Sequence, residues 1–147
     1  MNQFEPLIGE WRTEGEIPID PPLKISGTTT IEPLGAFIVI RTVGEPVEVP
    51  DSISIVGGAP EDEAQPMRYF DSRGVQRLYL TSVKGSTWTV SRAPGEDWNG
   101  PQGPGFNQRF IGDISPDGKS INGRWERGMG DAGDQWETDF PITYSRS

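Results

Sequence analysis

The 147-residue chain contains no cysteine and no histidine. Without cysteine there is no disulfide, thiolate zinc site or thiol nucleophile. Without histidine there is no Ser-His-Asp triad and no histidine-ligated haem or metal. We therefore expect no metal site and no cofactor. The length is that of one ordinary domain with a core of its own, so residues 1–147 are expected to form a single domain.

Basic residues are also scarce, because 13 Lys and Arg face 22 Asp and Glu, which gives a net charge of −9. A surface that tracks phosphates needs clustered Lys and Arg, and this charge also disfavours anionic membrane surfaces. No apolar run approaches the ~20 residues of a membrane helix, and the first residues lack the basic and apolar regions of a signal peptide. We therefore expect a cytoplasmic protein with no nucleic-acid or membrane partner.

Helix signals are nearly absent, since every window with helical apolar spacing is interrupted by Gly or Pro. Short runs of alternating apolar and polar residues recur instead, separated by turn residues such as those at 72–74 and 116–118. The 19 Gly and 14 Pro fit a chain with many turns. This pattern predicts ten strands, at 7–17, 23–31, 36–43, 52–56, 67–71, 75–83, 87–92, 106–114, 121–127 and 136–145.

Ten sequential strands joined by short turns predict an antiparallel meander. A meander of this length usually closes, because closure removes its unpaired edges. We therefore predict an all-β fold, a closed up-and-down antiparallel barrel of about ten strands, with a β-sandwich as the alternative. A barrel of this size is too wide to be filled by its own side chains alone, so we expect a ligand-sized cavity inside it.

Residues at both ends of the chain resemble those of the calycin (lipocalin-like) barrels, which include the lipocalins, the fatty-acid-binding proteins and the ten-stranded nitrobindin-like group. The first predicted strand carries Gly9-Glu10-Trp11, and the last ends in Tyr144-Ser145-Arg146. Segment 69–75 also resembles small uncharacterised bacterial proteins of this kind. The resemblance implies that Trp11 closes one end of the barrel and that Arg146 packs across it in a cation–π contact. Nitrobindins bind haem through a proximal histidine, which this chain lacks, so haem binding is not expected.

Several polar residues lie an even number of positions from aromatic residues on the predicted strands, so they are expected on the same, inner face. An interior with Arg, Tyr and Trp suits an amphipathic ligand with a carboxylate or carbonyl head. The strands at 36–43 and 75–83 are partly apolar on both faces, so the opposite orientation, with Ile38, Ile40, Leu78 and Leu80 inside, remains an alternative. The residues predicted to line the cavity are Phe37, Arg41, Tyr69, Arg77, Tyr79, Trp88, Arg92, Gln108, Phe110, Trp125 and Trp136.

Three functions fit such a barrel. The first is binding of a small, largely apolar, elongated or aromatic molecule whose polar head is oriented by Arg77 and Arg92. The second is a cofactor-independent cyclase or isomerase that orients a polyene or polyketide substrate. Its general base would be a buried carboxyl with a raised pKa, for which the candidates are Asp71, Glu126 and Asp139. The third is assembly through the outer face, with a homodimer patch at Leu78 and Leu80.

Two glycine-rich segments are predicted to be loops. Residues 128–133 match the letters of the dinucleotide-binding fingerprint, but that motif needs a following helix, and a strand-like alternation follows here. Residues 93–105 carry Trp98 and are either a lid over the barrel mouth or a surface loop packed on its rim.

Overall fold

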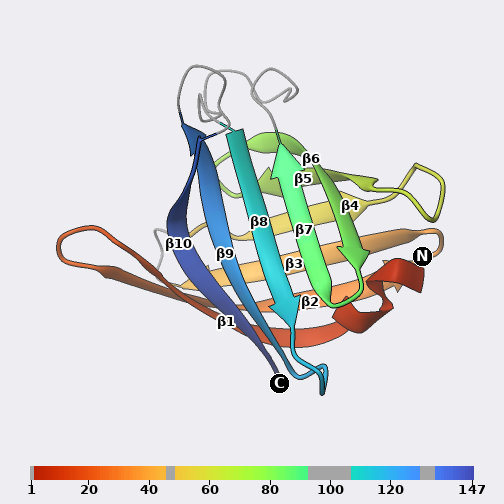
Figure 1. Ribbon diagram of the computed structural model, residues 1–147, viewed down its shortest axis with the longest axis horizontal. Helices are drawn as coiled ribbons and strands as arrows, with labels where there is room; N and C mark the ends of the chain where they lie inside the picture. The colour runs from red at the N-terminus through yellow and green to blue at the C-terminus, as the bar shows by residue number, and fades with distance from the viewer. Residues whose placement is uncertain (1, 46–48, 93–106, 130–134) are drawn as a thin grey trace.

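Ten antiparallel strands form one closed barrel in the computed structural model, which describes residues 2–45, 49–92, 107–129 and 135–147 (Figure 1). Each strand pairs with the next along the chain, and the last pairs with the first. The predicted closed up-and-down barrel is therefore confirmed, and the sandwich is excluded. The strands are β1 (Gly9–Ile17), β2 (Leu23–Leu34), β3 (Phe37–Glu45), β4 (Ser52–Val56), β5 (Gln65–Asp71), β6 (Gln76–Lys84), β7 (Thr87–Arg92), β8 (Asn107–Ile114), β9 (Ser120–Met129) and β10 (Gln135–Arg146).

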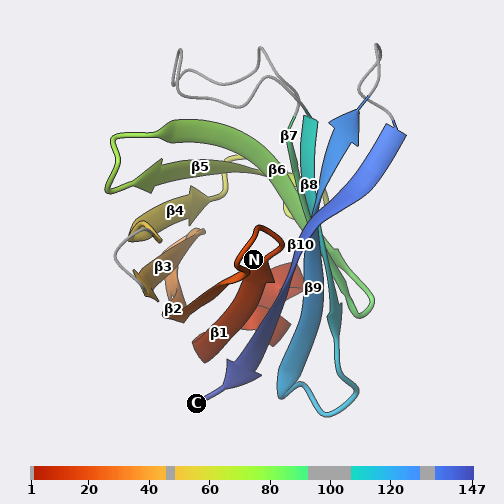
Figure 2. The same ribbon diagram turned by 90° about the vertical axis from the view of Figure 1, so that its left-hand side faces the viewer.

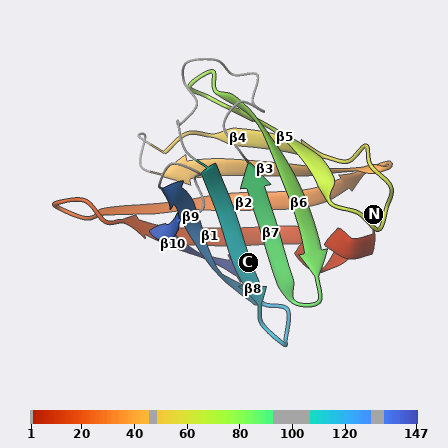
Figure 3. The ribbon, with the colours of Figure 1, turned by 45° about the horizontal axis from the view of Figure 1, so that its top comes forward.

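The strands cross the barrel axis at an angle, as closure of a sheet requires. In Figure 1, β7, β8 and β9 run steeply along the near side while β2 and β3 cross behind them. Figure 3 shows the same crossing from above, and Figure 2 shows β10 beside both β1 and β9. β1 and β10 pair from Trp11↔Arg146 to Gly15↔Ile142, and beyond these residues the β1–β2 hairpin projects away from β10.

A short 3₁₀-helix, η1 (Asn2–Leu7), covers one end of the barrel, which we call the closed end. Phe4 and Leu7 of this helix are buried against Trp11, whose Nε1 donates a hydrogen bond to the Leu7 carbonyl oxygen at 2.9 Å. This helix was not among the elements predicted from the sequence. The three-residue spacing of Phe4 and Leu7 is the signal for it, because side chains three apart eclipse in a 3₁₀ turn.

Arg146, near the C-terminus, contacts N-terminal residues at the closed end of the barrel. Its guanidinium carbon lies 4.1 Å from the centre of the Trp11 ring, so the predicted cation–π contact is confirmed. The same guanidinium donates to the carbonyl oxygens of Pro6, Ile8 and Gly118 at 2.8, 2.7 and 2.8 Å. Gly9 is required beside it, because its φ of +136° suits glycine and a Cβ there would collide with Arg146.

The orientation of β6 is the predicted one. Tyr79 faces inward and is buried, whereas Leu80 lies on the outer face and is 50% exposed. Arg77 shares the inward parity of Tyr79, and its guanidinium carbon lies 5.9 Å from the centre of the Tyr69 ring. The arginine of this strand is therefore on the inner side of the barrel.

The orientation of β3 is the opposite of the predicted one, so the prediction that Phe37 and Arg41 line the cavity is wrong. Ile38 and Ile40 belong to the core, whereas Phe37 is 43% exposed. The Nε of Arg41 lies 3.9 Å from a Glu32 carboxylate oxygen on the outer face. Because both faces of this strand carry apolar residues, alternation alone does not reveal which face is inside.

A β-bulge in β10 overturns the prediction that Trp136 lines the cavity. Thr138 pairs with Glu126 and Phe140 pairs with Trp125, so Asp139 is an extra residue in the ladder. The extra residue reverses the parity of the strand, and Trp136 consequently lies on the outer face. Its ring centre is 3.9 Å from the guanidinium carbon of Arg109.

No helix in the part of the chain that the structure describes has the length and apolar character needed to cross a membrane. The 93–105 segment with Trp98 and most of the 128–133 segment fall outside the described residues.

Candidate functional site

The described residues line a partly open cavity of about 110 Å³ inside the barrel. A cavity of ~150 Å³ holds benzene, so this one has room for roughly a single ring. Drug-sized pockets measure several hundred Å³, so the predicted elongated ligand fits only if it extends beyond these residues. Each strand from β3 to β10 contributes to the lining, which consists of Ile40, Thr42, Ser52, Ser54, Met67, Tyr69, Tyr79, Trp88, Val90, Phe110, Trp125 and Tyr144.

Aromatic side chains form one side of the cavity, which we call the aromatic wall. Neighbouring rings in it have centroids 5.0–6.1 Å apart, and most are tilted or edge-to-face. Such pairs are favourable because the positive edge of one ring meets the negative face of the next. All three tyrosines of the chain belong to this wall. It consists of Tyr69, Tyr79, Trp88, Phe110, Trp125 and Tyr144.

A pair of glycines makes room for the central ring of the aromatic wall. Gly112 on β8 and Gly123 on β9 face each other in the ladder. A Cβ at Gly112 would lie 2.9 Å from Cζ of Phe110, and one at Gly123 would collide with the same ring. The absence of both Cβ atoms therefore lets Phe110 pack against the barrel wall.

Hydroxyl groups form the other side of the cavity, which we call the hydroxyl wall and which consists of Thr42, Ser52 and Ser54 on β3 and β4. The hydroxyl of Thr42 is hydrogen-bonded to that of Thr29 at 2.9 Å. The two serine hydroxyls have no hydrogen-bond partner among the described residues, and Ser54 is only 4% exposed. These serines therefore present uncommitted polar groups to the cavity.

The polarity of β4 is inverted relative to an ordinary barrel strand. Its sequence places Ser52 and Ser54 inside the barrel and Ile53 and Ile55 outside. Strands normally turn their apolar residues toward the core, so such an inversion marks a position where stability is not the only requirement.

A buried acid–phenol pair lies beside the cavity. The Tyr69 hydroxyl donates to a carboxylate oxygen of Asp71 at 2.7 Å, and Arg73 donates to the same oxygen at 2.6 Å. Burial alone would raise the pKa of Asp71, but the hydrogen bonds from Arg73 and Tyr69 outweigh it and hold that pKa below its usual range. Burial and the bond to Asp71 raise the pKa of Tyr69. The Tyr69 proton is thus committed to Asp71, and its oxygen can only accept from a ligand.

Tyr144 differs from Tyr69, because its hydroxyl has no hydrogen-bond partner in the described part of the chain. Burial alone raises the pKa of this hydroxyl to about 12, with no charge or hydrogen bond contributing. Its ring packs 5.7 Å from Trp88 and 6.1 Å from Phe110, measured between centroids. Tyr144 therefore brings a phenol with an uncommitted proton to the cavity.

Polar residues on the inner face of their strands lie at the end of the barrel away from η1, which we call the far end. The buried Nε of Arg77 has no hydrogen-bond partner among the described residues. Arg92, which is 5% exposed, is opposite Gln108 in the β7–β8 ladder. The Tyr79 hydroxyl donates to Oε1 of Gln108 at 3.4 Å. The far end thus combines two inward arginines with the polar edge of the aromatic wall.

The structure brings together eight of the eleven residues that the sequence analysis placed inside. Five line the cavity, namely Tyr69, Tyr79, Trp88, Phe110 and Trp125. Arg77, Arg92 and Gln108 lie at the far end, whereas Phe37, Arg41 and Trp136 are outside. Tyr144 and the hydroxyl wall were not among the residues predicted to line the cavity. The alternation of Phe140, Ile142 and Tyr144 was the available signal for Tyr144.

Two of the carboxyl groups considered as general bases, Asp71 and Glu126, have a lowered pKa, whereas such a role requires a raised one. Glu126 lies on the outer face, where its carboxylate accepts from Arg109 at 2.6 Å and from Arg124 at 3.1 Å. Burial raises the pKa of Glu126, but these two hydrogen bonds outweigh it and keep the pKa low. Asp71 is also held ionised, and Asp139 is the extra residue of the bulge.

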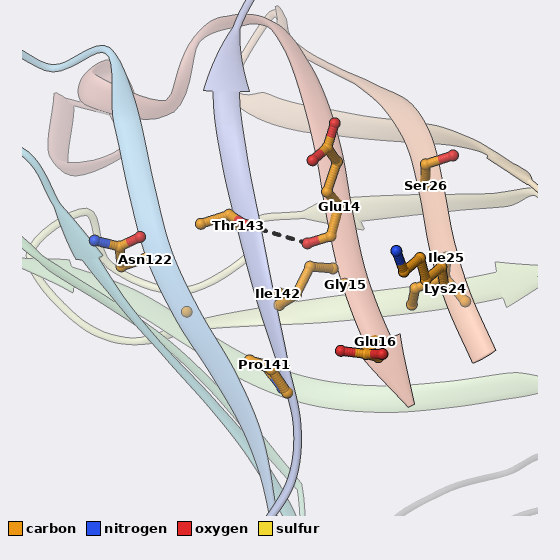
Figure 4. Close-up of a pocket in the computed structure, with 11 residues that line it drawn as sticks. Glu14, Gly15, Glu16, Lys24, Ile25, Ser26, Asn122, Pro141, Ile142 and Thr143 are labelled. Carbon is orange, nitrogen blue, oxygen red and sulfur yellow. Dashed lines mark hydrogen bonds between the residues drawn. The ribbon is translucent and has the colours of Figure 1, made fainter. Parts of the chain in front are cut away.

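A larger hollow of about 630 Å³ lies where the β1–β2 hairpin diverges from β9 and β10 (Figure 4). Its charged side chains, Glu14, Glu16 and Lys24, are exposed to solvent. The Thr143 hydroxyl donates to the Glu14 carbonyl oxygen at 3.2 Å, which joins its two sides. The internal cavity is the stronger candidate site, because it lies inside the barrel and is lined by aromatic rings.

Comparisons with known proteins support the fold. No protein-family model matches the sequence, and no curated protein matches it. The backbone is similar to that in the crystal structure of Rv2717c from M. tuberculosis, with a TM-score of 0.73 and 12% sequence identity over 99% of this chain and 96% of that one. At this identity the likeness establishes a common barrel architecture, which is compatible with ligand binding.

Proposed function

We propose that the barrel binds a small amphipathic molecule with an aromatic body and an anionic head. The body packs against the aromatic wall inside the cavity, where edge and face contacts with Trp88, Phe110 and Trp125 favour a flat ring. The head lies toward Arg77 and Arg92 at the far end. A cavity of about 110 Å³ limits the body to about one ring. The proposed ligand therefore has the polar head and apolar body expected from the sequence. Its body is shorter than the elongated one that the sequence suggested.

The observation that carries this proposal is the position of Arg77. Its Nε is buried on the inner side of the barrel without a hydrogen-bond partner among the described residues. A buried donor left without an acceptor costs ~1–3 kcal/mol, and more when it is charged. A carboxylate on the ligand would supply that acceptor, in a charge-assisted hydrogen bond.

Binding of benzoate tests the proposal, with the fluorescence of the cavity tryptophans or titration calorimetry as the readout. We expect Arg77→Gln to weaken benzoate binding by about 10- to 100-fold, since a hydrogen bond to a charged group contributes ~1.5–3 kcal/mol. Arg68→Gln is the matched control, because Arg68 is exposed on the outer face of β5 and its loss changes the net charge equally. Equal effects of the two variants, or no binding by the wild type, would overturn the proposal.

The cavity itself is tested by Gly123→Ala, which leaves both arginines in place. The added methyl group must displace the Phe110 ring toward the cavity. We expect benzoate binding to be lost or strongly reduced in this variant. Undiminished binding would show that the ligand lies outside the cavity.

Two finer assignments belong to the same proposal. Membership of the calycin superfamily is supported by the Trp11–Arg146 contact at the closed end. A homodimer through the outer face of β6 is supported by the 50% exposure of Leu80. Size measurement in solution, with Leu80→Lys as the variant, tests this second assignment.

A further inference from the structure

The cavity is not uniformly apolar, and its polar groups are of two kinds. The Tyr69 hydroxyl donates its hydrogen bond to Asp71, so its oxygen can only accept from a ligand. The hydroxyls of Tyr144, Ser52 and Ser54 have no hydrogen-bond partner in the described part of the chain, so each can donate or accept. A ring that fills this cavity therefore meets uncommitted hydroxyl groups in a buried place.

These hydroxyls come from both sides of the cavity. Ser52 and Ser54 belong to the hydroxyl wall on β4, and Tyr144 belongs to the aromatic wall on β10. The inversion of β4 keeps its isoleucines outside and its serines inside, although the opposite arrangement would bury more apolar surface. Polar groups inside proteins are almost always hydrogen-bonded, and these hydroxyls face the cavity, so we seek their partner in what occupies it.

We infer that the ligand's ring carries a hydroxyl group, so that the site selects a phenol over an unsubstituted ring. A phenol hydroxyl can accept from Tyr144 and donate to a serine oxygen at the same time, while its ring packs against Trp88 and Phe110. This inference deepens the proposed function and rests on it for the location of the ligand. Together the two describe a small hydroxylated aromatic acid.

The raised pKa of Tyr144 agrees with this assignment, because burial is its only cause and the hydroxyl is neutral at physiological pH. A neutral hydroxyl that has no partner among the described residues is free to discriminate between ligands by hydrogen bonding. A site built in this way rejects an analogue that lacks the matching group, because its own polar atoms are then left unpaired.

Comparing phenol with benzene tests the inference without involving the arginines. In wild-type protein we expect phenol to bind about five- to tenfold more tightly than benzene, the effect of one or two neutral hydrogen bonds. Tyr144→Phe should weaken phenol binding by a similar factor and leave benzene binding unchanged or stronger. Benzene is the internal control, because it fills the same cavity and makes no hydrogen bond.

The outcomes separate this inference from the proposed function. If benzoate and benzene bind but phenol has no advantage over benzene, the hydroxyl inference is wrong and the proposed function stands. If benzoate fails to bind while phenol is preferred over benzene, the anionic head is wrong and the hydroxyl inference stands. Should Tyr144→Phe not fold, the phenol-to-benzene ratio of the wild type and of Ser54→Ala decides, and a wild-type ratio of one overturns the inference.

Discussion

The two sides of the cavity differ in what they contribute to the molecule. The aromatic wall, on β5 to β10, is a continuous chain of ring contacts that includes the buried Phe110. The hydroxyl wall, on β3 and β4, offers small side chains, and two of its three hydroxyls have no partner among the described residues. The first side is what a barrel needs to be stable. The second side serves the ligand that we propose, and its contribution to stability is tested below.

The same contrast explains why the cavity persists instead of collapsing. Large rings span most of the interior, and the glycine pair at 112 and 123 holds the central one against the barrel wall. Opposite them, small serines leave unfilled space that larger apolar residues would close. The cavity is thus the result of a size difference between the two walls.

Removing the central ring of the aromatic wall should have the largest effect. Phe110→Ala is expected to lower the free energy of unfolding by about 3–5 kcal/mol, because it deletes a fully buried ring and leaves a void. Phe37→Ala is the matched control, since that ring is 43% exposed. We expect it to change stability by less than about 1 kcal/mol. Urea unfolding measures both, and similar losses would contradict the assigned inside and outside faces.

Raising the pH should have the second-largest effect on the stability of the folded protein, through Tyr144 in the aromatic wall. Because burial raises the pKa of Tyr144 to about 12, its neutral form stabilises the folded state fully below pH 10. As the pH rises from 10 to 12, the tyrosine ionises in the unfolded chain before it does so in the folded one. The expected loss of unfolding free energy is on the order of 2 kcal/mol. Urea unfolding at pH 9 and pH 11.5 should show a smaller loss in Tyr144→Phe than in the wild type.

An absorbance titration of the folded protein at high pH provides the control for this prediction. The chain has three tyrosines, and burial raises the pKa of both Tyr69 and Tyr144. At most one phenol should therefore ionise near pH 10 before the protein unfolds. Ionisation of two or three phenols at that pH would contradict the burial of the aromatic wall.

The sequence was sufficient to predict the barrel and most of the aromatic wall, for physical reasons. Turn residues at regular intervals determine the number of strands, and ten strands in a meander favour closure. Trp88 alternates with polar neighbours on β7, and Phe110 shares its face of β8 with Gly112 and Ile114, so their orientation follows. The closed end was partly predictable, because Trp11 and Arg146 stand at the matching ends of the first and last strands.

The errors fall where alternation carries no information about inside and outside. On β3 both faces are apolar, so Ile38 and Ile40 could not be distinguished from Phe37 and Val39 by pattern. In β10, Asp139 adds one residue to the ladder and reverses the side on which Trp136 lies. On β4, an apolar-in rule would point Ile53 inward. The hydroxyl wall is therefore visible in the pairing register and not in the composition.

Ser54→Ala should have the smallest effect and provides the most direct comparison of the two walls. Ser54 is 4% exposed, and its hydroxyl has no partner among the described residues. Replacing a hydroxyl that faces the cavity without a protein partner breaks no hydrogen bond between described residues, so the free energy of unfolding should stay the same or rise by less than about 1 kcal/mol. Ser91→Ala, at an exposed position of β7, is the matched control for the change in strand propensity. A loss above about 2 kcal/mol at Ser54 relative to Ser91 would show that the hydroxyl wall stabilises the barrel, and the cavity would then need no ligand to explain its serines.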